Sequence, residues 1–473
     1  MTKPSFLKPA PVGINSSSTY PGACCGSQIK VNCDGTFTVT EGNDEGTFTR
    51  EELQNAIGCD GSATVCINGH QVTLTAAQLA QCGCIRVPET GSDEAASADE
   101  SSGSDETTNA GMETEIHSDG SVTRTGENGT MHTNTDGETT VTANGDGNDT
   151  IDVQYQKDGS VTVTINGEKI HVTAEQAKNL TIDGGEGNDK INVATQNSEG
   201  KSGLTIIGGD GNDELTGGNG SETIVGGAGK DTIYGRGGDD TIDGGAGDDK
   251  IRGGSGSDNI VGGDGNDNIN AGTGDDKVDG GKGNDTIAAG MGNDNVLGGS
   301  GLDTISAMSG NNEIDGGKGN DTITSGNGDN IILGGKGNDT ITVGDGDNEI
   351  HGNDGSDHIT TGDGKNTVHG GRDSDTIITG AGDDTIIGGR GSDTIFAGAG
   401  NDYIEGNRGK DKIYAGAGND EIHGGKHKDY IETGTGEDTV GSTRNGWFRS
   451  RDRVVEGTTL PPNVDNPNAV TPS

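Results

Sequence analysis

The chain has 473 residues, of which 92 are glycine, while apolar residues make up only 26% and aromatic residues 3%. This composition excludes an ordinary globular core and favours a repeat architecture, in which each short unit buries one side chain against its neighbours. A net charge of −46 disfavours nucleic acid and acidic membrane surfaces as partners and favours multivalent cations.

The composition changes along the chain and divides it into successive regions. The N-terminus has no apolar core typical of a cleavable signal peptide, and no run of about 18 apolar residues predicts a membrane span. The predicted regions are a disordered N-terminus (1–20), a Cys-rich β-hairpin module (21–90), an acidic linker (91–110), a β-rich module (111–207), a repeat array (208–441), and a cap with a C-terminal tail (442–473).

All seven cysteines lie in the region 21–90. Small extracellular domains are commonly held together by disulfides, so we expect disulfide bonds here, with one cysteine left over. A zinc site is the alternative, although the spacing contains no C-x2-C pair. The disulfide candidates are Cys24, Cys25, Cys33, Cys59, Cys66, Cys82 and Cys84.

The two β-rich regions contain a related segment. Residues 60–78 read DGSATVCINGHQVTLTAAQ, and residues 158–176 read DGSVTVTINGEKIHVTAEQ, at a constant offset of 98. Each copy predicts a strand, an Asn-Gly turn, a second strand and a short helix capped by Thr75 or Thr173. The recurring Asp-Gly pairs, such as Asp119-Gly120 and Asp158-Gly159, predict two-residue hairpin turns.

From Gly208 to Gly441 the sequence keeps one nine-residue register of the form G-G-x-G-x-D-x-U-x, where U is aliphatic. The array makes 26 units, and isolated copies lie at Asn144–Asp152 and Gly184–Asn192. Position eight is Leu, Ile or Val in all 26 units, and position six is Asp in 21. The period predicts short strands at positions seven to nine, with the aliphatic residue inward.

The loop chemistry predicts calcium. Glycines at positions one, two and four permit a tight turn that exposes carbonyl oxygens, and the aspartate at position six adds a carboxylate. Calcium takes about six to eight oxygen ligands and accepts such mixed shells. We therefore expect a parallel β-roll in which calcium ions bind between stacked loops, and in which folding depends on calcium.

Alternate units differ, which predicts that two units make one turn of the roll and that the roll has two loop edges. Edge A begins with the unit at Gly208, where positions one and six are always Gly and Asp. The candidate calcium ligands on edge A are Asp213, Asp231, Asp249, Asp267, Asp285, Asp303, Asp321, Asp339, Asp357, Asp375, Asp393, Asp411 and Asp429.

Edge B begins with the unit at Gly217. Along its units, the residue at position one changes from Gly to Ala, Ser, Val or Thr. The candidate ligands here, after Glu222 at the start, are Asp240, Asp258, Asp276, Asp294, Asp384, Asp402, Asp420 and Asp438. Four successive units instead carry Asn312, Asn330, Asn348 and Asn366. Asparagine still offers an oxygen but lacks the carboxylate charge, so we expect weak or absent calcium there, and the four residues could instead form a hydrogen-bonded ladder; the alternative is a row filled with calcium like the rest. The two edges together predict on the order of 20 calcium ions.

The array resembles the RTX (repeat-in-toxin) hemolysin-type calcium-binding repeats of secreted Gram-negative proteins. This resemblance implies a roll that stays unfolded at low cytosolic calcium, folds outside the cell and leaves by type I secretion. A Ser-rich N-terminus without acidic residues before Asp34 also fits a type III export signal.

The sequence contains no H-E-x-x-H, G-x-S-x-G or P-loop motif, so we expect no enzyme. The favoured function is a secreted, non-catalytic calcium-binding protein with a structural, adhesive or surface role and an unknown protein or surface partner. The alternative is a host-directed effector or toxin-like protein with its activity in residues 21–207. Equivalent positions in successive turns also predict that His351 stacks on His369, and Phe396 on Tyr414.

Overall fold

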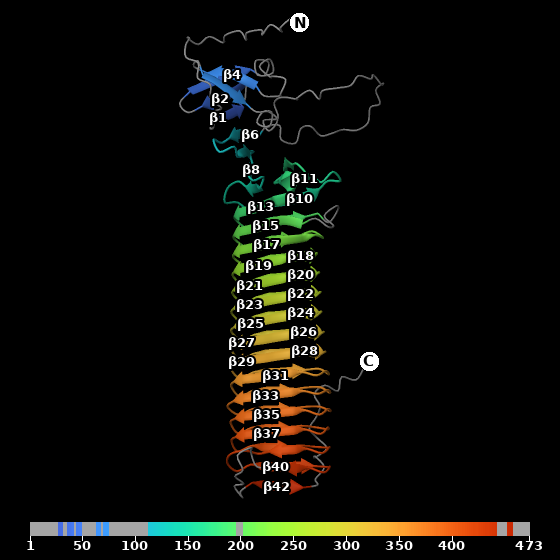
Figure 1. The fold of residues 1–473 in the computed structure, drawn as a ribbon. Helices are drawn as coiled ribbons and strands as arrows, with labels where there is room; N and C mark the ends of the chain where they lie inside the picture. Colours follow the sequence, from blue (N-terminus) through green and yellow to red (C-terminus); the bar gives the residue numbers. More distant parts are fainter. Residues whose placement is uncertain are drawn as a thin grey trace, which may run out of the picture. The chain divides into compact units, whose positions relative to one another are not determined.

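The computed structural model describes residues 112–194, 202–441 and 452–456, together with the backbone of five strands nearer the N-terminus (Figure 1). The described residues fold into two compact units, which comprise residues 1–186 with 203–205 and residues 187–202 with 206–473. The side chains of the seven cysteines, the predicted disordered N-terminus and the acidic linker lie outside the described residues.

The described part of the first unit consists mainly of antiparallel strands, with one short 3-10 helix. Strands β1 to β3 form one meander, β6 to β9 a second and β10 to β12 a third, and β13 joins β9 in parallel. The elements are β1 (Ser27–Val31), β2 (Thr36–Glu41), β3 (Asp44–Thr49), β4 (Ala63–Ile67), β5 (His70–Leu74), β6 (Glu113–Ile116), β7 (Val122–Thr125), β8 (Gly129–Thr133), β9 (Thr139–Ala143), β10 (Thr150–Tyr155), β11 (Val161–Ile165), β12 (Glu168–Val172), η1 (Gln176–Asn179) and β13 (Leu180–Glu186).

The predicted duplication forms the same hairpin twice. Strands β4 and β5 pair antiparallel from Ala63↔Leu74 to Ile67↔His70, and β11 and β12 pair in the equivalent register, from Val161↔Val172 to Ile165↔Glu168. The turn of the second copy has φ of 49° at Asn166 and 91° at Gly167, so both turn residues have positive φ, as the Asn-Gly pair predicts.

The short helix of the second copy is a 3-10 helix. The Thr173 hydroxyl accepts the backbone N–H of Gln176 at 3.4 Å, and the Gln176 side-chain oxygen accepts the backbone N–H of Thr173 at 3.1 Å. These reciprocal bonds satisfy free N–H groups at the start of η1 in the manner of a capping box.

At the Asp-Gly pairs that the structure describes, the predicted two-residue turn is wrong, because the loops have three residues. At the Asp158-Gly159 turn, the Gln156 N–H bonds the Ser160 carbonyl oxygen at 2.8 Å, and only the glycine has positive φ. The Asp158 carboxylate accepts the Ser160 backbone N–H and hydroxyl, and these bonds hold the aspartate in place. The same arrangement recurs at Asp119-Gly120.

The second unit is a parallel β-roll of two sheets, seen as stacked strands in Figure 1. The strands of one sheet are β17 (Ser221–Ala228), β19 (Thr241–Ala246), β21 (Asn259–Asp264), β23 (Lys277–Lys282), β25 (Asn295–Ser300), β27 (Glu313–Lys318), β29 (Ile331–Lys336), β31 (Glu349–Asp354), β33 (Thr367–Arg372), β35 (Thr385–Arg390), β37 (Tyr403–Arg408), β39 (Glu421–His423) and β41 (Thr439–Val440). The strands of the other are β14 (Lys190–Val193), β16 (Glu214–Thr216), β18 (Thr232–Gly237), β20 (Lys250–Ser255), β22 (Asn268–Thr273), β24 (Thr286–Met291), β26 (Thr304–Ser309), β28 (Thr322–Asn327), β30 (Thr340–Val343), β32 (His358–Thr360), β34 (Thr376–Ile378), β36 (Thr394–Phe396), β38 (Lys412–Tyr414), β40 (Tyr430–Gly434) and β42 (Arg453–Glu456). Strand β15 (Ser202–Asp210) contributes residues to both units.

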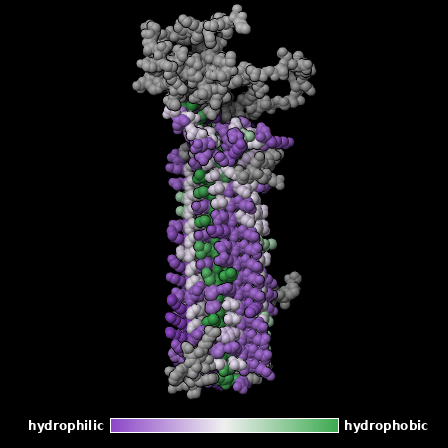
Figure 2. Space-filling model, viewed as in Figure 1, coloured by the Kyte–Doolittle hydropathy of each residue, from purple (hydrophilic) through white to green (hydrophobic). Residues whose placement is uncertain are grey.

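The register of the roll confirms the predicted turn of two nonapeptide units. Strand β17 pairs with β19 from Thr223↔Thr241, and the same step continues to the pair Glu421↔Thr439. The aliphatic residue at position eight points inward along the array, and Ile233, for example, is fully buried. Because the outward positions are polar, the viewed face of the roll is mostly hydrophilic, with one narrow apolar band (Figure 2).

Glycine is favoured at position four because the turns stack so closely. Gly229 has φ of 138°, and a Cβ at this residue lies far inside van der Waals contact of the carbonyl oxygen of Gly211, one turn earlier. Asp373 and His427 are the exceptions at position four, and both have positive φ, 73° and 87°. The contact explains why glycine recurs at this position along the array.

The predicted stacks of equivalent side chains are confirmed on the roll. His351 and His369 lie on neighbouring strands with ring centroids 4.7 Å apart. Phe396 and Tyr414 stack at 4.7 Å with an interplanar angle of 5°.

Candidate calcium-binding loops

The aspartates at position six are buried and held by the backbone of the neighbouring turn. On edge A the backbone N–H of Asp213 donates to Oδ1 of Asp231 at 2.8 Å, and the N–H of Asp231 donates to Oδ1 of Asp249 at 2.8 Å. This pattern continues to the bond from Asp411 to Asp429. One carboxylate oxygen of each aspartate therefore has a fixed partner, and the side-chain orientation is set by the roll.

The second carboxylate oxygen of these aspartates is buried and has no hydrogen-bond partner. A buried acceptor without a partner is costly, so a complete row of them fits a site for a bound cation. The edge A residues with such an Oδ2 atom are Asp213, Asp231, Asp249, Asp267, Asp285, Asp303, Asp321, Asp339, Asp357, Asp375, Asp393, Asp411 and Asp429. On edge B they are Asp240, Asp258, Asp276, Asp294, Asp384, Asp402 and Asp420.

Carbonyl oxygens face the same space as these free carboxylate oxygens. A Cβ placed on Gly244, at position one, lies 2.6 Å from Oδ2 of Asp249 and 2.5 Å from the carbonyl oxygen of Gly262. The absent side chain at position one therefore leaves the free carboxylate oxygen and a carbonyl oxygen of the next turn on the same side of the Gly244 backbone.

The position-six carboxylates repel one another and are poorly solvated. Burial, followed by the charges of neighbouring carboxylates, raises the pKa of Asp267 to about 7 and that of Asp375 to about 8. On edge B, burial and the charge of Glu222 raise the pKa of Asp240 to about 8. A divalent cation between the turns removes this repulsion and restores the ionised form.

No group of three or more His, Cys, Asp or Glu side chains converges on one point within the described residues. Each loop site would therefore combine at most two carboxylates with backbone carbonyl oxygens. This donor set suits calcium, a hard cation, and does not suit zinc or copper. His351 and His369 likewise form a stacked pair with no third ligand among the described residues.

The four asparagines of edge B form the predicted ladder. The amide nitrogen of Asn330 donates to Oδ1 of Asn348 at 3.0 Å, and that of Asn348 donates to Oδ1 of Asn366 at 2.9 Å. Asn312 donates in the same way to Asn330 at 3.0 Å. The side chains take the position of the edge B aspartates, and their backbone N–H groups bond to the next turn as well.

The amide nitrogens also bond the loop carbonyls. The Nδ2 atom of Asn330 donates to the carbonyl oxygens of Gly326 at 3.3 Å and Gly328 at 2.8 Å. The Nδ2 atom of Asn348 donates to Gly346 at 3.0 Å. An NH2 group therefore stands where the neighbouring units have an unpaired oxygen. These loops are satisfied by hydrogen bonds within the protein.

From Ala271 onward, position one of edge B carries a side chain, whereas position one of edge A is always glycine. Ala271 and Val343 are fully buried there, and the Ser325 hydroxyl donates to Oδ1 of Asn330 at 2.9 Å. Asp276 nevertheless keeps its unpaired oxygen beside Ala271, so a methyl group at position one does not satisfy the aspartate. The structure brings all position-six candidates onto the two predicted edges.

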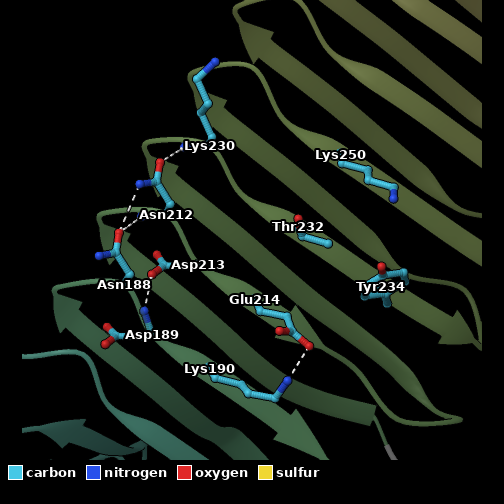
Figure 3. Close-up of a pocket in the computed structure, with 10 residues that line it drawn as sticks. All are labelled: Asn188, Asp189, Lys190, Asn212, Asp213, Glu214, Lys230, Thr232, Tyr234 and Lys250. Atoms are coloured by element: carbon cyan, nitrogen blue, oxygen red, sulfur yellow. Dashed lines mark hydrogen bonds and ion pairs between the residues drawn. The ribbon is translucent and has the colours of Figure 1, made fainter.

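Two aspartates extend edge A beyond the predicted ligands. The backbone N–H of Asp189 donates to Oδ1 of Asp213 at 2.7 Å, as Figure 3 shows, and the N–H of Asp429 donates to Oδ1 of Asp452 at 3.1 Å. The sequence separation is 24 in the first pair and 23 in the second, so a search for a strict period of 18 misses both. Asp189 occupies position six of the isolated repeat at Gly184–Asn192, so the sequence contained a signal for this residue.

A second ladder on the outside of the loops was also missed. The Lys230 backbone N–H donates to Oδ1 of Asn212 at 2.7 Å, and the Asn212 N–H donates to Oδ1 of Asn188 at 2.7 Å (Figure 3). These residues occupy position five, where Asn, Asp and Ser recur along the array. The recurrence of a polar residue at position five was the sequence signal for this ladder. The side chain at this position bonds a backbone N–H of the neighbouring loop and so connects successive loops.

A comparison with models of known protein families finds a match over most of the roll. The model described as RTX calcium-binding nonapeptide repeat matches residues 181–197 and then successive overlapping segments from 205 to 440, which together cover more than half of the chain. No curated protein matches the chain.

Proposed function

This chain belongs to the RTX calcium-binding nonapeptide repeat family, and from this premise we propose that its roll folds by binding calcium between the stacked loops of both edges. The observation that carries the proposal is the row of buried, unpaired Oδ2 atoms facing carbonyl oxygens. Calcium supplies the positive charge that offsets these carboxylates. The protein supplies the spacing, because Oδ1 of each aspartate is held by the next turn.

The proposed ligands are the position-six aspartates of both edges, and the total remains on the order of 20 ions. Edge A is continuous, and Asp189 and Asp452 extend it at its two ends. Edge B is interrupted from Asn312 to Asn366, where the amide nitrogens replace the cation. We therefore expect no calcium between the asparagine units.

Folding and calcium binding should be coupled. Without the ion, ionised aspartates are buried next to one another, which disfavours the folded state at neutral pH. Because calcium binds the folded state and not the unfolded chain, each added ion shifts the folding equilibrium towards the folded state. Most nonapeptides contribute only the one buried aliphatic residue at position eight, so the apolar core alone offsets little of this repulsion between aspartates.

A calcium titration of the full chain, followed by far-ultraviolet circular dichroism, tests this function. We expect a cooperative gain of β-signal with calcium and none with magnesium, which prefers a smaller, octahedral shell. A chain with full β-signal in excess chelator would contradict the coupling. Equilibrium dialysis of the folded protein then counts the bound ions.

The proposed setting is outside the cell, where calcium is abundant, with a structural, adhesive or surface role. The described residues contain no helix long and apolar enough to span a membrane. The family resemblance favours type I export. The alternative remains a secreted effector with its activity in residues 21–207. Retention of the protein on producing cells, lost on chelation, supports the structural role, whereas transfer into host cells supports the effector.

A further inference from the structure

Basic residues are concentrated on one short stretch of edge A. Seven of the 16 lysines and arginines of the array lie between residues 372 and 428. Arg372, Arg390, Arg408 and Lys426 all occupy position three of successive edge A units, and all four are exposed. Position three of edge B carries Asp363, Ala381, Ala399 and Ala417 over comparable turns. The positive charge at position three is therefore specific to one edge of the roll.

These side chains follow one another up the roll in a straight row. Arg372 pairs in register with Arg390 and Arg390 with Arg408, at the ends of β33, β35 and β37 (Figure 1). Arg408 forms a parallel bridge with Lys426. Neighbouring strands are about 4.8 Å apart, so the row presents one cationic group at each such step.

A groove runs along the row. It has a volume of about 380 Å³ and is lined by Gly371, Gly389 and Asn407 between the three arginines. The two glycines add no side chain to the groove, so the three arginines and Asn407 supply the side chains of its lining. Arg372 is paired with Asp354 at 2.8 Å. Arg390 and Arg408 make no ion pair or side-chain hydrogen bond within the described part of the chain, and their donors are available.

We infer that this groove binds a sulfated or carboxylated polysaccharide along the roll axis. Guanidinium groups form paired hydrogen bonds with sulfate and carboxylate oxygens, and a row of them suits a polymer with regularly spaced anions. The step between strands is close to the length of one sugar residue in an extended chain. A single-stranded nucleic acid is the poorer match, because its binding uses aromatic platforms and the row contains none.

This inference rests on the proposed function in one respect, since the calcium-loaded roll is the binding form. Asp375, Asp393 and Asp411 lie three residues after Arg372, Arg390 and Arg408 in the same loops, and bound calcium would neutralise them. With calcium bound, the exposed arginines dominate the local field and attract anions despite the net charge of −46.

The test uses the full-length protein in saturating calcium, with dextran sulfate as the probe and neutral dextran for comparison. The variant Arg390→Ser/Arg408→Ser removes two charges, and serine is native at position three of the same edge, at Ser300. The control Lys250→Thr/Lys277→Thr removes the same charge from strand positions at which threonine is common.

We expect dextran sulfate to bind the natural protein, to bind the arginine variant about tenfold more weakly, and to bind the lysine control unchanged. Equal binding by the arginine variant overturns the inference, because calcium bridging to acidic surfaces would persist in that variant. Equal loss in both variants, or tighter binding of a single-stranded oligonucleotide, overturns it as well. Circular dichroism of each variant in calcium separates a failure of the roll to fold from a failure of the groove to bind.

Discussion

The asparagine ladder makes a prediction in which the effect of one substitution depends on calcium. In Asn330→Asp the new carboxylate has no N–H to donate. It loses three hydrogen bonds, to the carbonyl oxygens of Gly326 at 3.3 Å and Gly328 at 2.8 Å and to Oδ1 of Asn348 at 3.0 Å. The substitution also places a carboxylate oxygen next to the three oxygen atoms that accepted those hydrogen bonds.

The magnitude follows from these contacts. A neutral hydrogen bond contributes about 1 kcal/mol net, so three lost bonds reduce the free energy of unfolding by about 3 kcal/mol. That loss applies at limiting calcium. At saturating calcium the new carboxylate resembles the other edge B aspartates and can bind an ion, so the loss should shrink or reverse in sign.

The assay is urea unfolding followed by circular dichroism, first at calcium just above the folding midpoint and then at saturation. Asp339→Asn is the matched control, since Asp339 lies on edge A of the same turn and has an unpaired Oδ2. Its destabilisation should grow with calcium. If Asn330→Asp is equally destabilising at both concentrations, or has no effect, then the Asn330 amide does not take the place of a cation and the reasoning fails.

Further predictions concern protons and turn geometry. Asp240 and Asp375 have a pKa of about 8 when folded, against an ordinary 3.8, so their contribution favours the metal-free fold in acid and is lost as the pH rises through about 8. In chelator the β-signal should therefore be strongest in acid, while the calcium concentration needed for folding should fall as the pH rises; the opposite trends contradict the assigned burial. Gly229→Ala should lower stability in calcium by more than about 2 kcal/mol, because its Cβ meets a backbone carbonyl at positive φ. Gly147→Ala, whose Cβ meets nothing within 4 Å, is the control in urea unfolding and should change little.

Most of the fold could be predicted from the sequence, because its contacts repeat with the chain. Once equivalent positions of successive turns are stacked, the pairs Thr223↔Thr241 and His351↔His369 follow from the register alone. The inward aliphatic row and the two edges of loops follow from the same period. The hairpin at Asn166-Gly167 was also predictable, since its turn conformation is local.

The predictions failed where the geometry departs from the period or depends on side-chain orientation. Three-residue loops replaced the two-residue turns at Asp-Gly, because the Asp158 carboxylate bonds Ser160 within the loop. Asp189 and Asp452 join edge A through pairings that are longer than the regular period, which loops of different length permit. A search for a repeat depends on a constant number of residues between equivalent positions. A sheet requires only that its strands lie side by side, whatever the length of the loop between them.

The sequence by itself determined the repeat, its calcium chemistry and the existence of two unlike edges, because each depends on which residue types recur in every unit and in every second unit. Only the tertiary structure decided which oxygen of each aspartate is free, because that depends on a backbone N–H from the neighbouring turn. It also decided between the alternatives for the asparagines, since whether an amide nitrogen reaches two loop carbonyls and the next asparagine is a matter of distance. The arginine row is the same case: three arginines in successive turns become neighbours only when the turns stack.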